Sequence, residues 1–220
     1  MTRSEMARLL DHSVLKPEST EREVLAGADL VRQWGIGFFC VQPTLVSAAA
    51  GALQGSAARV VSVVGFPHGC GRSVVKAQEA TLAVQDGAAE VDMVLNVGKL
   101  KSGRNQAVAS EIAQVVRAVP GIPVKVILEA CLLTDEEKTI ACRLVQDAGA
   151  AFVKTSTGFN PGGGATAADV RLMRATVGRD FGVKAAGGIR ALRDALAMLE
   201  AGANRIGTSA SAAILGALAP

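Results

Sequence analysis

Three segments of the chain share one pattern, which constrains the fold more than any other feature of the sequence. In each, a helix-like stretch ends, a glycine turn follows and a β-rich run begins; the segments are QDGAAEV (85–91), QDAGAAFV (146–153) and LEAGANRI (199–206). Glycine is common just after a helix end because it adopts the left-handed conformation without strain. The repeated unit indicates strands that alternate with helices, and such strands form a parallel sheet.

Eight β-rich runs and eight helical segments can be placed along the chain. The expected strands are 9–13, 36–41, 59–66, 90–97, 124–130, 151–158, 182–188 and 204–209. The expected helices are 19–34, 43–53, 73–86, 103–118, 134–148, 166–178, 190–201 and 208–218. Eight units in 220 residues predict an α/β fold of the (βα)8 TIM-barrel type, a single domain over residues 1–220. A doubly wound open sheet is the alternative, weakened because no glycine-rich nucleotide-binding motif follows an early run.

Composition and charge argue against several classes of protein. Half of the residues are hydrophobic, which is enough for a large core. The net charge is +3 without a basic tract, so nucleic acid is not an expected partner. The longest mildly apolar stretch, 36–53, is interrupted by Gln42 and Pro43 and does not predict a membrane span. Four cysteines without a CxxC pair, behind an N-terminus that lacks a signal-peptide core, predict reduced thiols and a cytoplasmic protein.

Several expected strands carry charged residues, although strands of a parallel sheet are covered on both faces and are usually apolar. These residues are Asp92, Lys125, Glu129, Lys154 and Lys184. Burying an unpaired charge costs on the order of several kcal/mol, so each of these side chains must contact a partner, water or a ligand. Side chains alternate between the two faces of a strand, so Asp92 shares its face with Glu90, and we expect this polar face to point into the barrel.

Two interpretations of these interior charges remain open at this point. A structural cluster of ion pairs would account for one Asp–Lys pair, but two interior lysines with few acids are harder to explain in that way. Two ammonium groups in one pocket of low dielectric constant lower each other's pKa. An amine whose pKa approaches neutrality is a nucleophile for imine formation with a carbonyl. The pattern therefore favours a Schiff-base site.

Three clusters rich in Gly, Ser and Thr follow the last three expected strands. They are TSTG (155–158), GGIR (187–190) and GTSAS (207–211). Loops after the seventh and eighth strands form the common phosphate site of such barrels, because glycine lets main-chain N–H groups approach the anion. The alternative is that these glycines only turn the chain. Three clusters at corresponding positions favour a phosphorylated small carbonyl compound as ligand. With only His12 and His68, the chain does not predict a metal-dependent aldolase site.

Six motifs, in order along nearly the whole chain, together resemble the deoxyribose-phosphate aldolases: DHSVLKP, EVDMVLN, VKVILEA, FVKTSTGF, VKAAGGIR and RIGTS. The resemblance implies reversible cleavage of 2-deoxy-D-ribose 5-phosphate to D-glyceraldehyde 3-phosphate and acetaldehyde. It also implies a class I mechanism that uses neither a metal nor another cofactor.

The same resemblance implies roles for individual residues. Lys154 would form the Schiff base, Lys184 would keep it deprotonated and help to move protons, and Asp92 would donate and accept protons with Lys184 through a water. Asp11 and Lys125 match accessory pocket positions. The implied phosphate contacts are Thr157, Gly158, Gly187, Gly188, Gly207 and Ser209.

Two positions depart from the family pattern. Phe159 stands where some members have a phosphate-contacting lysine, and Ala210 stands where a second serine is common, so we expect a lower phosphate affinity. Two other functions compete with the aldolase: a different phosphosugar barrel, which should lack this combination of motifs, and a non-catalytic phosphosugar-binding protein, which should have a broken set of two lysines and one aspartate. A homodimer is compatible with the apolar barrel exterior, although no pattern identifies an interface.

Overall fold

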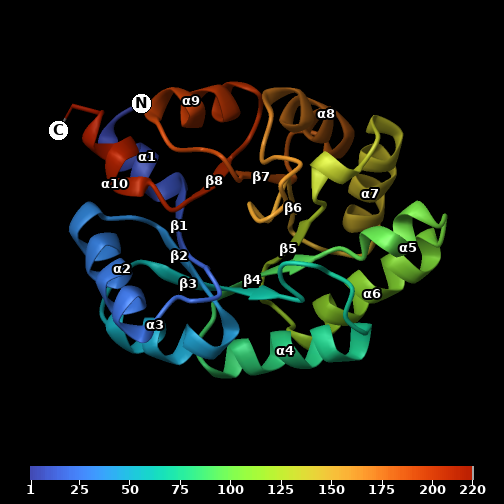
Figure 1. Cartoon of the computed structure of the whole chain (residues 1–220), viewed down its shortest axis with the longest axis horizontal. Helices are drawn as coiled ribbons and strands as arrows, with labels where there is room; N and C mark the ends of the chain where they lie inside the picture. Colours follow the sequence, from blue (N-terminus) through green and yellow to red (C-terminus); the bar gives the residue numbers. More distant parts are fainter. Residues whose placement is uncertain (220) are drawn as a thin grey trace.

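In the computed structural model, which describes residues 1–219, eight parallel strands close into a barrel in the order β1 to β8, and β8 pairs with β1. The strands are β1 (Leu10–Val14), β2 (Phe38–Val41), β3 (Arg59–Val64), β4 (Glu90–Val94), β5 (Val124–Ile127), β6 (Phe152–Lys154), β7 (Gly182–Ala186) and β8 (Arg205–Thr208). Figure 1 shows them at the centre of a ring of helices. This arrangement confirms the predicted TIM barrel, and every expected strand is present.

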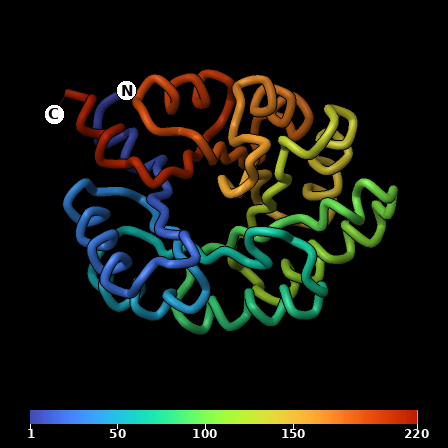
Figure 2. The backbone as a smooth tube through the Cα atoms, in the orientation of Figure 1, coloured from blue at the N-terminus to red at the C-terminus, as the bar shows by residue number. Residues whose placement is uncertain are grey.

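The helices form the outer layer, which Figure 2 shows as a continuous ring of coils around the barrel. They are α1 (Arg3–Leu9), α2 (Glu21–Trp34), α3 (Val46–Ala52), α4 (Ser73–Gln85), α5 (Val97–Lys101), α6 (Asn105–Ala118), α7 (Asp135–Asp147), α8 (Ala167–Val177), α9 (Leu192–Glu200) and α10 (Ser211–Gly216), with the short 3-10 helices η1 (Pro43–Leu45) and η2 (Ala130–Leu132). The two ends of the chain lie side by side, where Arg3 donates to the carbonyl oxygens of Leu215 and Leu218.

Local sequence explains where several helices begin and end. Thr20 and Thr134 cap α2 and α7 and accept from the main-chain N–H three residues ahead, while the glutamate at that position bonds back to the cap. Gly149 and Gly202 follow α7 and α9 with φ of 80° and 111°. Helices α1 and α5 were not expected from the sequence, and Thr2 and Asn96 begin them with side-chain caps.

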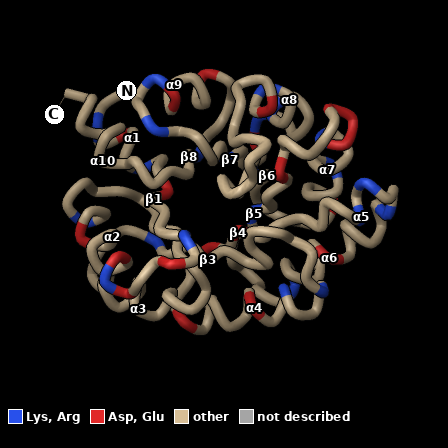
Figure 3. Tube along the Cα trace, viewed as in Figure 1, with Lys and Arg blue, Asp and Glu red and all other residues tan. Residues whose placement is uncertain are grey.

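The apolar faces of the strands pack outward against the helices, and this interface is the main core. Inside the barrel the lining is uneven. One side is apolar, with Cys40, Val61 and Val63 in a small cluster of their own. The charged residues of β4 to β8 and β1 fill the other side. Basic and acidic residues are also interspersed over the outer helices (Figure 3). No helix in residues 1–219 is both long and apolar enough to cross a membrane.

Candidate active site

A cavity of about 330 Å³ opens at the carboxyl ends of the strands. Its walls come from β1, β2, β6, β7 and β8 and the loops that follow them; the lining residues are Asp11, Ser13, Leu15, Lys16, Cys40, Lys154, Thr157, Gly158, Phe159, Lys184, Ala186, Gly187, Gly188, Ile189, Arg190, Gly207, Thr208 and Ser209. Active sites of TIM barrels lie at this end, because residues from several strands converge there.

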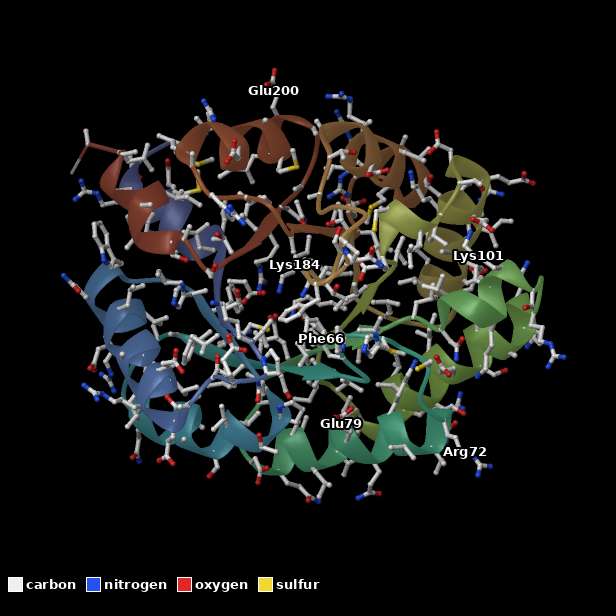
Figure 4. The ribbon with its side chains drawn as sticks, viewed as in Figure 1. Phe66, Arg72, Glu79, Lys101, Lys184 and Glu200 are labelled. Atoms are coloured by element: carbon white, nitrogen blue, oxygen red, sulfur yellow. The ribbon has the colours of Figure 1, made fainter. Side chains whose placement is uncertain are left out.

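Two lysines meet on one carboxylate oxygen at the floor of this cavity. The Nζ atoms of Lys154 and Lys184 each lie 2.7 Å from Oδ2 of Asp92. Lys184 also contacts Oδ2 of Asp11 on β1. All four side chains are buried. Figure 4 shows Lys184 near the centre of the ring, whereas Lys101 and Glu200 lie at its outer rim. The barrel therefore brings together residues from β1, β4, β6 and β7 that are far apart in the sequence.

A second group of charges lies beneath Asp92, away from the cavity. Lys125 places its Nζ 2.8 Å from Oδ1 of Asp92 and 2.6 Å from Oε2 of Glu90. Arg205 pairs with the same Glu90 oxygen at 3.2 Å and stacks over the ring of Phe38. Lys125, expected to be an accessory pocket residue, does not line the cavity. Its position instead fixes the Asp92 carboxylate from below.

The expectation of two interior lysines with few acids is wrong. Asp11, Glu90 and Asp92 supply acids for every interior lysine. Burial lowers the pKa of Lys184, but the carboxylates of Asp11 and Asp92 outweigh it and hold that pKa above its ordinary value. Burial raises the pKa of Asp92, but the three lysines outweigh it and hold that pKa well below its usual range. Lys184 is therefore a cation beside an ionised Asp92.

The barrel interior contains more cationic groups than carboxylates. Three carboxylates, those of Asp11, Glu90 and Asp92, face four cationic groups, those of Lys125, Lys154, Lys184 and Arg205. Fully ionised, this buried group carries one excess positive charge. An uncompensated charge is costly in a low-dielectric interior, so this group would be balanced if one of its lysines were neutral.

The glycine-rich loops after β6 and β7 meet at the opposite wall of the cavity. Gly158, Gly187 and Gly188 have φ of 83°, 88° and 78°, and a Cβ on Gly187 would lie 3.2 Å from Cα of Gly158. Within residues 1–219, no acceptor is found for the main-chain N–H groups of these three residues or of Ser209. Such free donors around a cavity suit an anionic ligand.

Gly207 lies deeper than the other glycines and is buried in β8. A Cβ at this position would lie 3.1 Å from Cε of Lys184 and 3.0 Å from Cβ of Ala186. Its lack of a side chain therefore leaves room for the Lys184 chain. This close packing was not expected from the sequence, which suggested only a phosphate contact at Gly207.

Thr157 lines the cavity, but both of its donors are already used. Its N–H donates to Oε1 of Glu129 at 3.1 Å, and its hydroxyl donates to Oε2 at 2.5 Å. Glu129 has φ of 55° and is the one non-glycine residue at positive φ in the described part of the chain. That conformation costs on the order of 1–3 kcal/mol, and such strain concentrates at functional sites. The sequence marked Glu129 as an out-of-place charge without suggesting its partner.

Aromatic side chains form the rim of the cavity. Phe159 is half-exposed and meets Phe66, from the loop after β3, edge to face at 5.2 Å between ring centroids. Arg190 and Lys16 bring cationic side chains to the same rim. Neither residue was named as a candidate from the sequence, although Arg190 ends the GGIR cluster and Lys16 lies in the DHSVLKP motif.

Cys40 lines the floor of the cavity, and burial raises the pKa of its thiol to about 12. In residues 1–219, no three His, Cys, Asp or Glu side chains form a metal-binding group.

Known proteins resemble the chain in sequence and in structure. The model of the DeoC/LacD family of aldolases matches residues 3–217. A deoxyribose-phosphate aldolase of Streptococcus pneumoniae serotype 19F is 55% identical over 208 residues, which cover 94% of each chain. The tetrameric deoxyribose phosphate aldolase of Aeropyrum pernix superposes with a TM-score of 0.90 at 31% identity, covering 98% of this chain and 91% of the other. The aldolase QR15 gives 0.91 at 39% identity, with coverage of 96% and 94%.

The family match spans the barrel and all the strands that supply the buried lysines and acids, and the relatives share the fold over nearly their full length. The chain therefore belongs to the DeoC/LacD family of aldolases.

Proposed function

We propose that the chain is a class I aldolase that reversibly cleaves 2-deoxy-D-ribose 5-phosphate to D-glyceraldehyde 3-phosphate and acetaldehyde, with Lys154 as the imine-forming amine. The observation that carries the proposal is the sharing of Asp92 Oδ2 between Lys154 and Lys184 at the floor of a cavity. Identity of 55% to the Streptococcus pneumoniae deoxyribose-phosphate aldolase supports the choice of substrate.

Among the buried lysines, Lys154 is the one best placed to react with a substrate. It contacts a single carboxylate oxygen, whereas Lys184 and Lys125 each contact two acids. Its neutral form leaves three cations and three carboxylates in the barrel interior. It also lines the cavity, as Lys125 does not. An uncharged amine at this place is ready to attack a carbonyl.

The reaction then follows from the positions of these groups. The Lys154 nitrogen adds to the aldehyde carbon of the open-chain sugar, and loss of water leaves a protonated imine. A base takes the proton of the hydroxyl on the carbon that will depart. The carbon–carbon bond breaks, its electron pair passes into the imine, and the products are the phosphorylated aldehyde and an enamine on Lys154. Protonation of the enamine carbon and hydrolysis release acetaldehyde. Asp92 and Lys184 are placed to relay these protons.

The phosphate group would lie against the free main-chain donors of the loops after β6, β7 and β8. Gly158, Gly187, Gly188 and Ser209 supply these N–H groups, and Arg190 stands at the same rim. Phosphate binding there would hold the aldehyde end of the substrate over Lys154.

Two further assignments belong to this proposal. We infer a cytoplasmic location because Cys40 and Cys142 are buried as free thiols, which persist in reducing compartments. We also infer that copies associate, as a homodimer or a larger assembly, because the Aeropyrum pernix relative is tetrameric.

A turnover assay on 2-deoxy-D-ribose 5-phosphate tests the proposal. The enzyme should form both aldehydes, and a chelator should leave the rate unchanged because the imine supplies the electron sink. Lys154→Met should abolish turnover, whereas Lys101→Met, which changes an exposed lysine on α5, should not. Absence of turnover by the wild-type chain, or full activity of Lys154→Met, would refute the assignment.

A further inference from the structure

A buried carboxylate lies directly behind the loop that carries Thr157 and Gly158. Glu129 is only 5% exposed and occupies the turn after β5. The N–H groups of its two neighbours, Leu128 and Ala130, donate to the carbonyl oxygens of Lys154 and Thr155 at 2.9 and 2.8 Å. Glu129 is thus held between two main-chain bonds to the end of β6.

Glu129 has a left-handed backbone, and its side chain reaches from the turn after β5 to the loop after β6. Both carboxylate oxygens accept from Thr157, one from its N–H and one from its hydroxyl. The Thr157 hydroxyl oxygen in turn accepts from the N–H of Phe159 at 3.1 Å. The series runs from Glu129 through Thr157 to Phe159 and holds both residues that flank Gly158.

These bonds leave Thr157 without a proton for a ligand. A threonine has one N–H and one O–H, and both point at Glu129. The free N–H of Gly158 is therefore the donor that this loop presents to the cavity. A negative charge behind an anion site weakens anion binding by simple electrostatics. The Glu129 carboxylate should therefore weaken phosphate binding unless another effect offsets it. The fixed geometry of the loop is such an effect.

We propose that Glu129 is a positioning residue that holds the loop 157–159 so that the N–H of Gly158 faces the phosphate group of the substrate, with Thr157 acting through Glu129 and not by direct contact with phosphate. The proposal rests on the phosphate position in the proposed function.

Glu129→Gln separates positioning from electrostatics, because the two effects have opposite signs. The amide keeps the size of the side chain and can accept at only one atom, so one Thr157 donor loses its acceptor. Positioning predicts that the inhibition constant of inorganic phosphate rises about tenfold. It also predicts a similar fall in the ratio of kcat/KM for 2-deoxyribose 5-phosphate to that for unphosphorylated 2-deoxyribose. A site governed by charge alone predicts tighter phosphate binding.

Thr157→Val is the second variant, and it removes the hydroxyl while keeping the shape of the residue. If Thr157 acts through Glu129, the loss in phosphate affinity resembles that of Glu129→Gln. The double variant then binds phosphate no more weakly than either single variant. If the hydroxyl contacts phosphate directly, the losses add, or Glu129→Gln releases the hydroxyl and tightens binding. Either of these results overturns the proposal.

Two controls keep the experiment decisive. Glu136→Gln removes an exposed carboxylate of α7 with the same change in net charge, and it should leave the phosphate constant unaltered. Glu129→Gly suits the left-handed backbone, so it should fold and still show the weakened phosphate binding. An equal fall in kcat/KM for 2-deoxyribose 5-phosphate and for unphosphorylated 2-deoxyribose would indicate general damage and overturn the proposal. Calorimetric binding of inorganic phosphate needs no turnover, so it tests Glu129 even if the wild-type chain proves inactive on the sugar.

Discussion

At the scale of single residues, the proposed chemistry depends on one oxygen atom. Oδ2 of Asp92 is shared by Lys154 and Lys184, and the other oxygen of Asp92 is held by Lys125. Because Asp11 also holds Lys184, this lysine stays charged beside Lys154. Its positive charge therefore lies beside the proposed nucleophile, on the same carboxylate oxygen. Lys184 is therefore an electrostatic partner of Lys154, and its removal should lower the rate of the reaction.

Lys184→Leu tests this role. The substitution removes one cation from the Asp92 carboxylate and a group that is placed to relay protons, so kcat should fall about a hundredfold or more. Lys184→Arg keeps the positive charge and should retain more activity than Lys184→Leu. Steady-state kinetics on 2-deoxy-D-ribose 5-phosphate measures both variants, and a kcat of Lys184→Leu equal to that of the wild type would contradict this role.

Phe159→Lys tests the departure at the rim of the cavity. Phe159 lies next to Gly158 and is half-exposed, so a lysine there would bring a cation near the phosphate position. We expect KM for the phosphorylated sugar to fall about threefold at low salt, because an exposed ion pair contributes less than about 1 kcal/mol. The gain should disappear at high salt. A KM that does not respond to the substitution would place the phosphate elsewhere.

At the scale of elements, β1 shows how one strand serves both layers of the barrel. Asp11 points inward to Lys184, and its neighbour His12 points outward, where it stacks with Phe39 and bonds Ser211 of α10 through Nδ1. Burial lowers the pKa of His12 to about 4. The imidazole therefore stays neutral in the folded chain over most of the pH range.

Because of His12, we expect the folded chain to lose stability in mild acid. In the unfolded chain its pKa is about 6.5, so below that pH the unfolded state gains a proton that the folded state does not. The stabilising effect is complete above pH 6.5 and is lost as the pH falls toward 4. Between pH 7.5 and 5 the free energy of unfolding should drop by about 2 kcal/mol. Urea unfolding of wild type and His12→Asn measures this, and an equal drop in both would exclude His12 as the cause.

The elements also show how far the sequence could predict the structure. Seven of the eight expected strands combine β-branched residues with a following turn, whereas the first, 9–13, contains no β-branched residue. Helices α1 and α5 were missed because they are short and begin from caps, Thr2 and Asn96, that carry little signal without a periodic apolar face. The convergence of Asp92, Lys154 and Lys184 was expected from buried charges and from family motifs. The bond between Glu129 and Thr157 was not, because it depends on a left-handed turn at a glutamate.

At the scale of the whole molecule, the barrel interior is divided between an apolar side and a continuous series of charges. The series runs from Arg205 and Glu90 through Lys125 to Asp92 and the lysines of the cavity. Each charge in this series contacts one of opposite sign, and the apolar cluster lies on the other side of the interior. Because the closed sheet fixes eight strands relative to one another, the spacing of these groups is set by the barrel as a whole.

Lys125→Met tests this dependence through stability. The substitution leaves Glu90 and one oxygen of Asp92 without their lysine, and removal of one partner from a buried pair costs about 3–5 kcal/mol. Lys101→Met, at an exposed ion pair, should cost less than about 1 kcal/mol. Denaturant unfolding compares the two variants. Equal stabilities would show that the interior charges do not hold the barrel together.

The identity of the nucleophile is tested most directly by borohydride reduction of the chain in the presence of acetaldehyde, followed by peptide mass mapping. Reduction of an imine would leave one ethyl group on one lysine. This ethyl group should be found on Lys154 alone, and Lys154→Met should not be labelled. Labelling of Lys184 or Lys125 in the wild-type chain, or no labelling of an enzyme that turns over its substrate, would contradict it.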